Sequence, residues 1–347
     1  MTAALSPVEP PLLEIDALSV TFDTRAGPVE ALRSVSLVVE AGETLGLVGE
    51  SGCGKSVTAQ AVMGLVDVPG RISGGDVRWR GRSLVDPRNA RFARSLRGRE
   101  IGMVFQDPMT SLNPLMPIGA QIGEVLTRHL GLTKAQARAR AVDLLAAVGI
   151  GAPRTRVDLH PHEMSGGMRQ RVMIAMAIAC EPALVLADEP TTALDVTVQA
   201  QILDLLADLQ QRLGIAIVLV SHDLGVVAGL CHRVAVMYAG QVVESAGVED
   251  LFARPAHPYT QGLLRSAPRL DDAPERLVGI EGAPPSLLDP PQGCGFLARC
   301  PIGDAACAVP PPARPVGPGR LAACVRPFTP AWGDDRSVID ERAEARR

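Results

Sequence analysis

The sequence predicts an α/β fold with an antiparallel β subdomain, a helical subdomain and a Pro-rich, Cys-containing C-terminal extension. Three observations support this prediction. A glycine-rich loop joins a short apolar strand to a helical pattern, and further short apolar runs alternate with amphipathic helical patterns. Beyond residue 254 the composition changes, because sixteen of the 29 prolines lie between positions 255 and 330. Strands that alternate with helices are typical of a sheet covered by helices.

The glycine-rich loop, residues 49–56, reads G-x-x-x-x-G-K-S and lies between an apolar strand and a helix, as a P-loop does. In a P-loop, backbone N–H groups bind phosphate, the lysine reaches the outer phosphates, and the serine hydroxyl can bind Mg²⁺. Lys55 is one of only two lysines in a chain with 32 arginines, and a compact ammonium suits this role. We therefore predict a P-loop NTPase whose loop contacts are Gly49, Glu50, Ser51, Gly52, Cys53, Gly54, Lys55, Ser56 and Val57.

Composition narrows the class of protein. A chain of 347 residues can bury a large core, and its net charge of −4 argues against a general binder of nucleic acid. No apolar run reaches the ~18 residues that a membrane-spanning helix needs. Residues 1–11 lack the basic and apolar regions of a signal peptide. We therefore expect a cytosolic protein with one large domain and an appendage.

The N-terminal part contains two β-rich runs, residues 12–22 and 29–39, which predict an antiparallel pair. Phe22, at the end of the first run, is either a platform on which a base stacks or a core residue. The arginine-rich residues 78–99 predict a solvated face, with contact to acidic lipid or a partner as the alternative. A further strand, residues 101–105, ends at Gln106.

Two helices are predicted in the middle of the chain. Residues 133–148 form the first helix. It begins with a capping box of Thr133 and Gln136 and ends before Gly149. The second follows Ser165-Gly166-Gly167, where free N–H groups and a hydroxyl form either an anion site or a simple helix cap.

Polar residues follow the next two apolar strands. Residues 183–187 end in Asp188-Glu189, a pair that suits an ATPase because one carboxylate can orient Mg²⁺ while the other polarises a water. Asp195 precedes a long helix, residues 196–213, and residues 215–220 form a strand that leads to His222. A lone histidine is more often structural, but strand ends in such a sheet deliver ligand-binding groups. A hairpin over residues 233–244 completes this part.

Together these motifs resemble, in the same order, those of ABC-type ATPases over about 200 residues. Phe22 falls where that family has its adenine-stacking aromatic, whereas Met168 departs from the glutamine that many members carry after Ser-Gly-Gly. The resemblance implies ATP and Mg²⁺, with Mg²⁺ held through Ser56, Gln106 and Asp188. It also implies that Glu189 is the catalytic base and that His222 holds the γ-phosphate and the attacking water. The corresponding motifs are Walker A (49–56), the Q-loop (Gln106), the signature (Ser165, Gly166, Gly167), Walker B (Asp188, Glu189), the D-loop (Asp195) and the H-loop (His222).

Four segments narrow the resemblance to the oligopeptide/dipeptide importer ATPases: residues 105–114, 161–171, 257–260, and 293–296 with 299–301. The expected domains are then a nucleotide-binding domain, 1–254, with a helical subdomain at about 107–180, and a C-terminal region, 255–347. The expected partners are two permease subunits, a second ATPase subunit in a heterodimer, and an extracytoplasmic peptide-binding protein. The chain would be peripheral, on the cytoplasmic face of the membrane, and its Ser-Gly-Gly and Asp195 would act on the partner's ATP.

Other functions remain open at this point. Nickel and glycoside importers share the subfamily. ABC ATPases that act on DNA or ribosomes usually carry two cassettes or a long coiled coil, and this chain has neither. An ordinary P-loop kinase has no use for the Ser-Gly-Gly signature.

Four cysteines, Cys294, Cys300, Cys307 and Cys324, are spaced C-x5-C-x6-C-x16-C in the Pro/Gly-rich tail. Thiols in a loop-rich segment of a reducing compartment suggest a metal staple, although the lack of C-x2-C pairs weakens a zinc ribbon. Some members of the resembling subfamily carry a [4Fe–4S] cluster on a similar set, so the resemblance favours that cluster over zinc or no metal.

Overall fold

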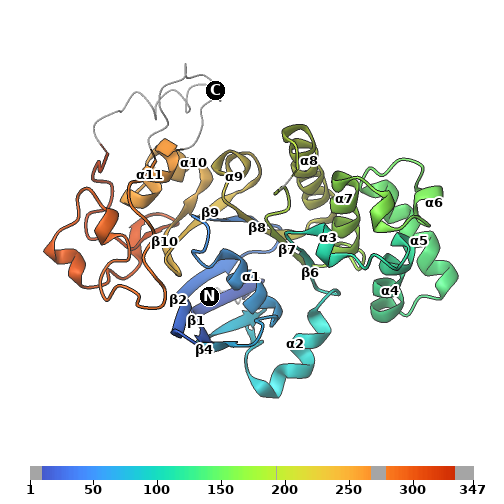
Figure 1. Cartoon of the computed structure of the whole chain (residues 1–347), viewed down its shortest axis with the longest axis horizontal. Helices are drawn as coiled ribbons and strands as arrows, with labels where there is room; N and C mark the ends of the chain where they lie inside the picture. The colour runs from blue at the N-terminus through green and yellow to red at the C-terminus, as the bar shows by residue number, and fades with distance from the viewer. Residues whose placement is uncertain (1–9, 193, 267–278, 333–347) are drawn as a thin grey trace, which may run out of the picture.

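The computed structural model describes residues 10–192, 194–266 and 279–332 (Figure 1). Within these ranges the strands form a four-stranded sheet in the order β2-β1-β4-β5 and an eight-stranded sheet in the order β11-β12-β10-β9-β3-β8-β7-β6. Most of the N-terminal segment considered for a signal peptide, residues 1–9, lies outside the described residues, as do residues 333–347 of the expected C-terminal region.

The small sheet is antiparallel and comes from the N-terminal part of the chain. Strands β1 (Leu13–Thr24) and β2 (Gly27–Val39) pair antiparallel, with Leu13 opposite Val39, so the predicted pair is confirmed. Strand β4 (Gly70–Trp79) pairs with the other edge of β1, and β5 (Arg82–Ser83) follows it.

The large sheet has a parallel centre, in which β6 (Ile101–Val104), β7 (Leu184–Asp188), β8 (Ala216–Ser221), β3 (Thr44–Val48) and β9 (Arg233–Tyr238) lie side by side. Because the carboxyl ends of parallel strands meet at one edge, the residues that follow β3, β6, β7 and β8 come together there. Strand β10 (Gln241–Gly247) turns back from β9 and pairs antiparallel with it, as the predicted hairpin requires.

The sheet separates two hydrophobic cores, because alternate residues of a strand face opposite sides. On β7, Leu184 and Leu186 face the core beneath the antiparallel sheet, and Val185 and Ala187 face the core beneath the helices. All five residues of β7 are buried, which explains why its first four residues, 184–187, are all apolar and do not alternate with polar ones.

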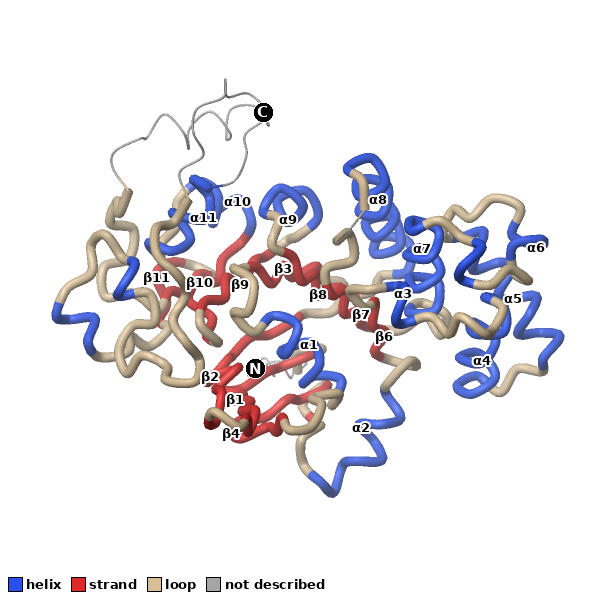
Figure 2. The backbone as a smooth tube through the Cα atoms, viewed as in Figure 1, coloured by secondary structure: helices blue, strands red, loops and turns tan. Residues whose placement is uncertain are grey.

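Helices cover the large sheet and extend beyond β6, where residues 108–177 contain helices but no strand (Figure 2). Helix α5 begins with the predicted capping box of Thr133 and Gln136, and α8 ends at Gly214 as predicted. The main helices are α1 (Lys55–Met63), α2 (Ala90–Leu96), α3 (Pro108–Ser111), α4 (Ile118–Leu130), α5 (Lys134–Ala147), α6 (Pro153–Arg156), α7 (Gly166–Ala177), α8 (Val196–Leu213), α9 (Leu224–Leu230), α10 (Val248–Ala253) and α11 (Pro258–Ser266).

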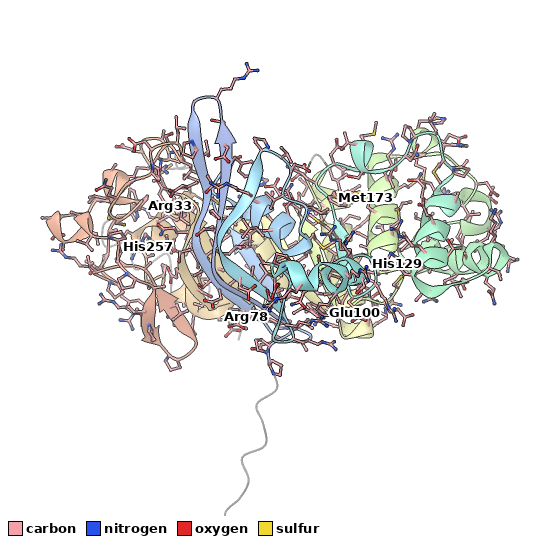
Figure 3. All side chains as sticks on the ribbon, turned by 90° about the horizontal axis from the view of Figure 1, so that it is seen from below. Arg33, Arg78, Glu100, His129, Met173 and His257 are labelled. Atoms are coloured by element: carbon pink, nitrogen blue, oxygen red, sulfur yellow. The ribbon has the colours of Figure 1, made fainter. Side chains whose placement is uncertain are left out.

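The C-terminal region packs against the same large sheet. Strand β12 (Arg320–Ala322) pairs with β10, and β11 (Arg314–Gly317) extends the edge. The carboxylate of the buried Glu244, on β10, accepts the N–H groups of Ala256 (2.7 Å) and His257 (2.8 Å) and lies 3.6 Å from the Arg320 guanidinium. His257 is fully buried within this part of the molecule (Figure 3). The tail therefore shares its core with the cassette.

The arginine-rich segment makes local contacts. Arg78 forms ion pairs with Glu14 and Asp16 on β1 and with Asp76 on β4. The Arg82 guanidinium stacks 4.0 Å from the Phe92 ring centre. Arg80, Arg82, Arg88, Arg91, Arg94 and Arg99 are exposed. Among the described helices, none is both long and apolar enough to span a membrane.

Candidate functional site

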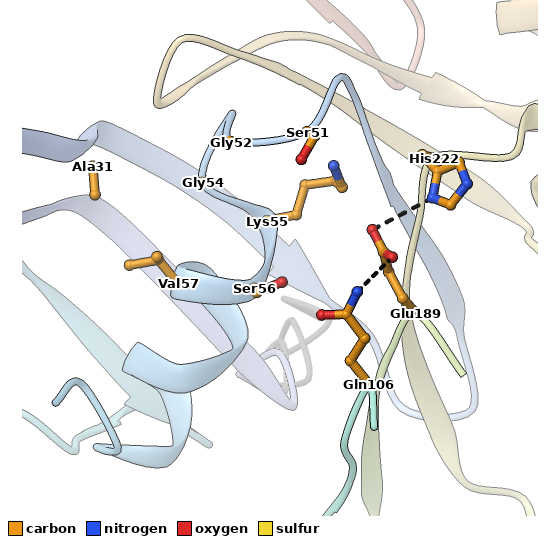
Figure 4. Close-up of a pocket in the computed structure, with 10 residues that line it drawn as sticks. All are labelled: Ala31, Ser51, Gly52, Gly54, Lys55, Ser56, Val57, Gln106, Glu189 and His222. Carbon is orange, nitrogen blue, oxygen red and sulfur yellow. Dashed lines mark hydrogen bonds and ion pairs between the residues drawn. The ribbon is translucent and has the colours of Figure 1, made fainter. Parts of the chain in front are cut away.

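A cavity of about 460 Å³ opens where β3, β6, β7 and β8 deliver their carboxyl-terminal residues (Figure 4). The side chains of Lys55 and Ser56 face Gln106, Glu189 and His222 across it. The residues that line the cavity are Ala31, Ser51, Gly52, Gly54, Lys55, Ser56, Val57, Gln106, Glu189 and His222.

The loop after β3 needs its glycines. Gly49, Gly52 and Gly54 have φ of 154°, 77° and 105°, values that other residues rarely adopt. A Cβ on Gly49 would also lie 2.2 Å from the carbonyl oxygen of Met237 on β9. These conformations bring the loop into α1, whose N-terminus begins at Lys55. The loop and helix together therefore fit the phosphate-binding role predicted for them.

Lys55 and Ser56 face the interior of the site. The Lys55 ammonium is buried and donates to the carbonyls of Gly49 (2.8 Å) and Glu50 (3.0 Å). The Ser56 hydroxyl donates to Oδ1 of Asp188 at 2.9 Å. Burial raises the pKa of Asp188, and the Ser56 hydrogen bond opposes that rise. A hydroxyl, a carboxylate and the nearby Gln106 amide are the oxygen ligands that Mg²⁺ prefers, so these residues fit the expected ion.

Glu189 is the centre of a hydrogen-bonded group. Its Oε2 accepts from Gln106 Nε2 (3.0 Å) and Thr192 Oγ1 (2.9 Å), and its Oε1 lies 3.4 Å from His222 Nδ1. Its backbone has a φ of 45°, an unusual value for a residue other than glycine. A carboxylate held by three side chains, on a backbone in an uncommon conformation, is suited to positioning a water molecule.

Several predicted site residues do not line the cavity. Phe22 packs over Gly70, where an added Cβ would lie 2.5 Å from the Phe22 ring, so its role in stacking stays a prediction. The Glu50 carboxylate is paired with Arg299 of the tail. Cys53 is buried, and burial raises the pKa of its thiol against the opposing charge of Lys55.

The Ser-Gly-Gly signature and Asp195 lie beside one another, outside the residues that line the cavity. Ser165 Oγ accepts the N–H of Met168 (3.3 Å), so it caps α7, and Asp195 Oδ1 caps α8 through the N–H of Val198 (2.9 Å). A Cβ on Gly167 would lie 2.6 Å from the Val198 side chain, which places the starts of α7 and α8 in contact. Figure 1 shows the two helices together, away from α1.

Three residues that contact this site were not among the predicted site residues. Ala31 lines the cavity from β2, and Thr192 holds Glu189. Tyr259, on α11, accepts the backbone N–H of Glu50. No short motif contains Ala31. Tyr259 belongs to the 257–260 segment of the resemblance, but its contact with the loop comes from tertiary packing and has no local signal.

The four tail cysteines are free thiols. Burial, together with negative charge on Cys294, Cys307 and Cys324, raises the pKa of Cys300 to about 11. Within the described ranges, no group of three or more His, Cys, Asp or Glu residues could hold a metal ion. As arranged here, the thiols therefore do not fit the expected [4Fe–4S] cluster.

Comparison with known proteins decides the family. Residues 32–192 match the ABC transporter family, and residues 243–307 match the C-terminal region of oligopeptide/dipeptide transporters. The chain is 51% identical to the oligopeptide transport ATP-binding protein OppD of Salmonella typhimurium, over 91% of this chain and 94% of that protein. The chain belongs to the ABC transporter family.

Other relatives agree with this assignment. The chain is 48% identical to the dipeptide transport ATP-binding protein DppD of Escherichia coli, over 92% of this chain and 98% of that protein. Among solved structures, the ATP-binding cassette MJ0796, a dimer bound to ADP and Pi in a post-hydrolysis state, has a TM-score of 0.61 and 27% identity, covering 68% of this chain and 98% of its own. The expected ABC ATPase fold is thus confirmed, and the chain is an ATPase of that family.

Proposed function

We propose that this chain hydrolyses ATP to drive the import of di- and oligopeptides across the cell membrane. One observation carries the proposal: a single cavity brings together Lys55, the Ser56–Asp188 pair, and Glu189 held between Gln106 and His222. The identity to oligopeptide and dipeptide transport ATP-binding proteins supports peptides as the transported solute.

Each residue has a proposed task in hydrolysis. Lys55 and the N–H groups of the loop bind the β- and γ-phosphates, and Glu189 takes a proton from the water that attacks the γ-phosphorus. His222 holds that water and the γ-phosphate, since its ring lies 3.4 Å from Glu189. Bound through Ser56, Gln106 and Asp188, Mg²⁺ would neutralise charge on the phosphates. Phe22 would stack on the adenine after a movement of its ring.

The signature supports a dimer of ATPases. Ser165, Gly166, Gly167 and Asp195 do not line the chain's own cavity, so we propose that they act on ATP bound to a second ATPase subunit. Contacts to the γ-phosphate would then favour the closed dimer, and hydrolysis would release it.

The remaining partners follow from the same proposal. The chain would lie on the cytoplasmic face of the membrane against two permease subunits, with an extracytoplasmic peptide-binding protein and no nucleic acid. Residues 1–254 would be the nucleotide-binding domain, with the helical subdomain at about 107–180 facing the permease, and residues 255–347 the transporter-type C-terminal region.

A [4Fe–4S] cluster on Cys294, Cys300, Cys307 and Cys324 is a separate proposal. The grouping of the four cysteines between residues 294 and 324 supports it, although their thiols would have to move closer together to bind the irons. Iron and sulfide analysis after anaerobic purification tests it. About four irons per chain would support the cluster, and iron-free protein with full ATPase activity would contradict it.

Solute uptake tests the main proposal. Cells that carry Lys55→Ala in place of the wild-type chain should lose uptake of labelled di- and tripeptides and keep uptake of nickel and glycosides. If only nickel uptake or only glycoside uptake were lost, the chain would be the ATPase of that importer and not of a peptide importer. Co-purification with nucleic acid in place of permeases would contradict an importer of any kind.

A further inference from the structure

The carboxylate of Glu50, the second residue of the phosphate-binding loop, is bound by the C-terminal region. Arg299, in a short turn between Cys294 and Cys300, makes a bidentate ion pair with it: Nη1 lies 2.7 Å from Oε2 and Nη2 3.0 Å from Oε1. Glu50 and Arg299 are 249 residues apart in the chain. The side chain of Arg299 is only 5% exposed, so solvent screens this pair weakly.

Arg299 uses all of its hydrogen-bonding capacity here. An arginine side chain has five N–H donors. Besides the two bonds to Glu50, Nη1 donates to the Tyr238 hydroxyl (3.2 Å), Nη2 to the carbonyl of Ile280 (3.1 Å) and Nε to that of Glu281 (3.0 Å). The hydrogen bonds to Glu50 raise the pKa of Arg299 above the ordinary value of an arginine side chain. A lysine could supply the charge at this place but not this set of bonds.

Tyr259 holds the same loop residue by its backbone. The Glu50 N–H donates to the Tyr259 hydroxyl at 2.9 Å. The Tyr259 ring is fully buried against Tyr238 and Phe296, with ring centres 4.5 and 5.4 Å away. Tyr238 ends β9, which pairs directly with β3, the strand that carries the loop. The tail and the loop are therefore anchored on one rigid aromatic cluster.

We propose that Arg299 and Tyr259 are positioning residues that hold the phosphate-binding loop in its ATP-binding shape, so that ATP affinity depends on the C-terminal region. Lys55 also bonds to this part of the loop, through the carbonyls of Gly49 and Glu50. When Lys55 binds the phosphates of ATP, it gives up those two bonds to the loop carbonyls, and the contacts of Arg299 and Tyr259 with Glu50 keep the loop in place. The inference rests on the ATP site proposed above.

The charge of Glu50 gives this arrangement a second effect. An unpaired carboxylate beside the loop would repel the negatively charged phosphates. Because Arg299 neutralises it, the loop can keep a glutamate at its second position without weakening nucleotide binding. Removing Arg299 should therefore weaken ATP binding both by loosening the loop and by exposing this charge.

The test compares ATP affinity and turnover in full-length variants. Fluorescent ATP-analogue titration should show Arg299→Ala binding about tenfold more weakly, equivalent to ~1.4 kcal/mol, with KM for ATP raised and kcat within about twofold. Arg299→Lys should restore part of the affinity. In the double variant, Glu50→Gln should recover part of the affinity lost in Arg299→Ala, because it removes the unpaired charge but does not restore the bonds that hold the loop.

The matched control is Arg326→Ala, which removes another tail arginine paired with an acid, Asp304, but without contact to the loop. It should leave ATP affinity unchanged. If Arg299→Ala and Arg299→Lys both bind ATP like wild type, the positioning role is wrong, although the ATPase assignment stands. If neither Arg299 variant folds, Tyr259→Phe replaces them, and binding of ATP like wild type by that variant has the same meaning. A wild-type chain that binds no ATP would overturn both.

Discussion

Replacing Glu189 by glutamine is the sharpest test of the chemistry. The amide oxygen of glutamine can occupy the place of Oε2 and accept from Gln106 and Thr192, whose donors lie 3.0 and 2.9 Å away. The amide nitrogen then faces His222 in place of Oε1. Glu189→Gln therefore keeps the packing and most of the hydrogen bonds of the site, and it removes the negative charge and the base.

The magnitude of the loss separates the two roles that Glu189 could have. Loss of one hydrogen bond is worth about 0.5–1.5 kcal/mol, at most roughly tenfold in rate. Loss of a general base lowers kcat by about 10²–10⁴-fold. We expect Glu189→Gln to bind ATP normally, to lose at least ~100-fold in kcat and to accumulate as an ATP-bound dimer.

Steady-state phosphate release and size-exclusion chromatography with ATP measure these effects. The matched control is Glu181→Gln, which changes an exposed glutamate paired with Arg140 and should leave kcat unchanged. Activity of Glu189→Gln within tenfold of wild type, with ATP binding intact, would refute the role of Glu189 as the base.

Three further predictions concern stability and loop shape. Gly49→Ala should abolish ATP binding, because its Cβ would lie 2.2 Å from the Met237 carbonyl oxygen. Gly52→Ala, with no atom within 4 Å of its Cβ, should cost only about 1–2 kcal/mol of loop strain. Nucleotide titration compares the ATP affinities of the two variants. Glu244→Leu should lose about 3–5 kcal/mol of unfolding free energy in urea, since it leaves two buried N–H groups without an acceptor and removes a buried carboxylate that lies 3.6 Å from Arg320. A loss below about 1 kcal/mol would contradict this reasoning. Burial lowers the pKa of His257 to about 4, below its unfolded value of about 6.5. The unfolded state therefore binds the proton first, and the free energy of unfolding falls as the pH drops from about 6.5 to 4. In urea unfolding measured over this pH range, His257→Gln should flatten the slope, and an unchanged slope would exclude His257 as its source.

The site residues that the sequence identified are those whose roles depend on local backbone geometry. The glycines of residues 49–54 need positive φ. Asp188 ends a strand that is buried on both faces, and Glu189 follows it directly. Such constraints act over a few residues, so they leave a readable pattern. The capping box of α5 and the Gly214 stop of α8 were predictable for the same reason.

The tertiary structure decided which distant residues meet. Arg299 and Glu50 form a partly buried ion pair across 249 residues, and no local pattern encodes that contact. The structure also sets the tail cysteines in an arrangement that does not hold a metal among the described residues, although their spacing had suggested one.

The sequence by itself therefore determined the nucleotide chemistry and the family, because both depend on short motifs with strict backbone requirements. Only the tertiary structure showed that the C-terminal region packs on the phosphate-binding loop. Burial and ion pairing between distant segments depend on how the whole chain folds, and a linear pattern does not contain that information.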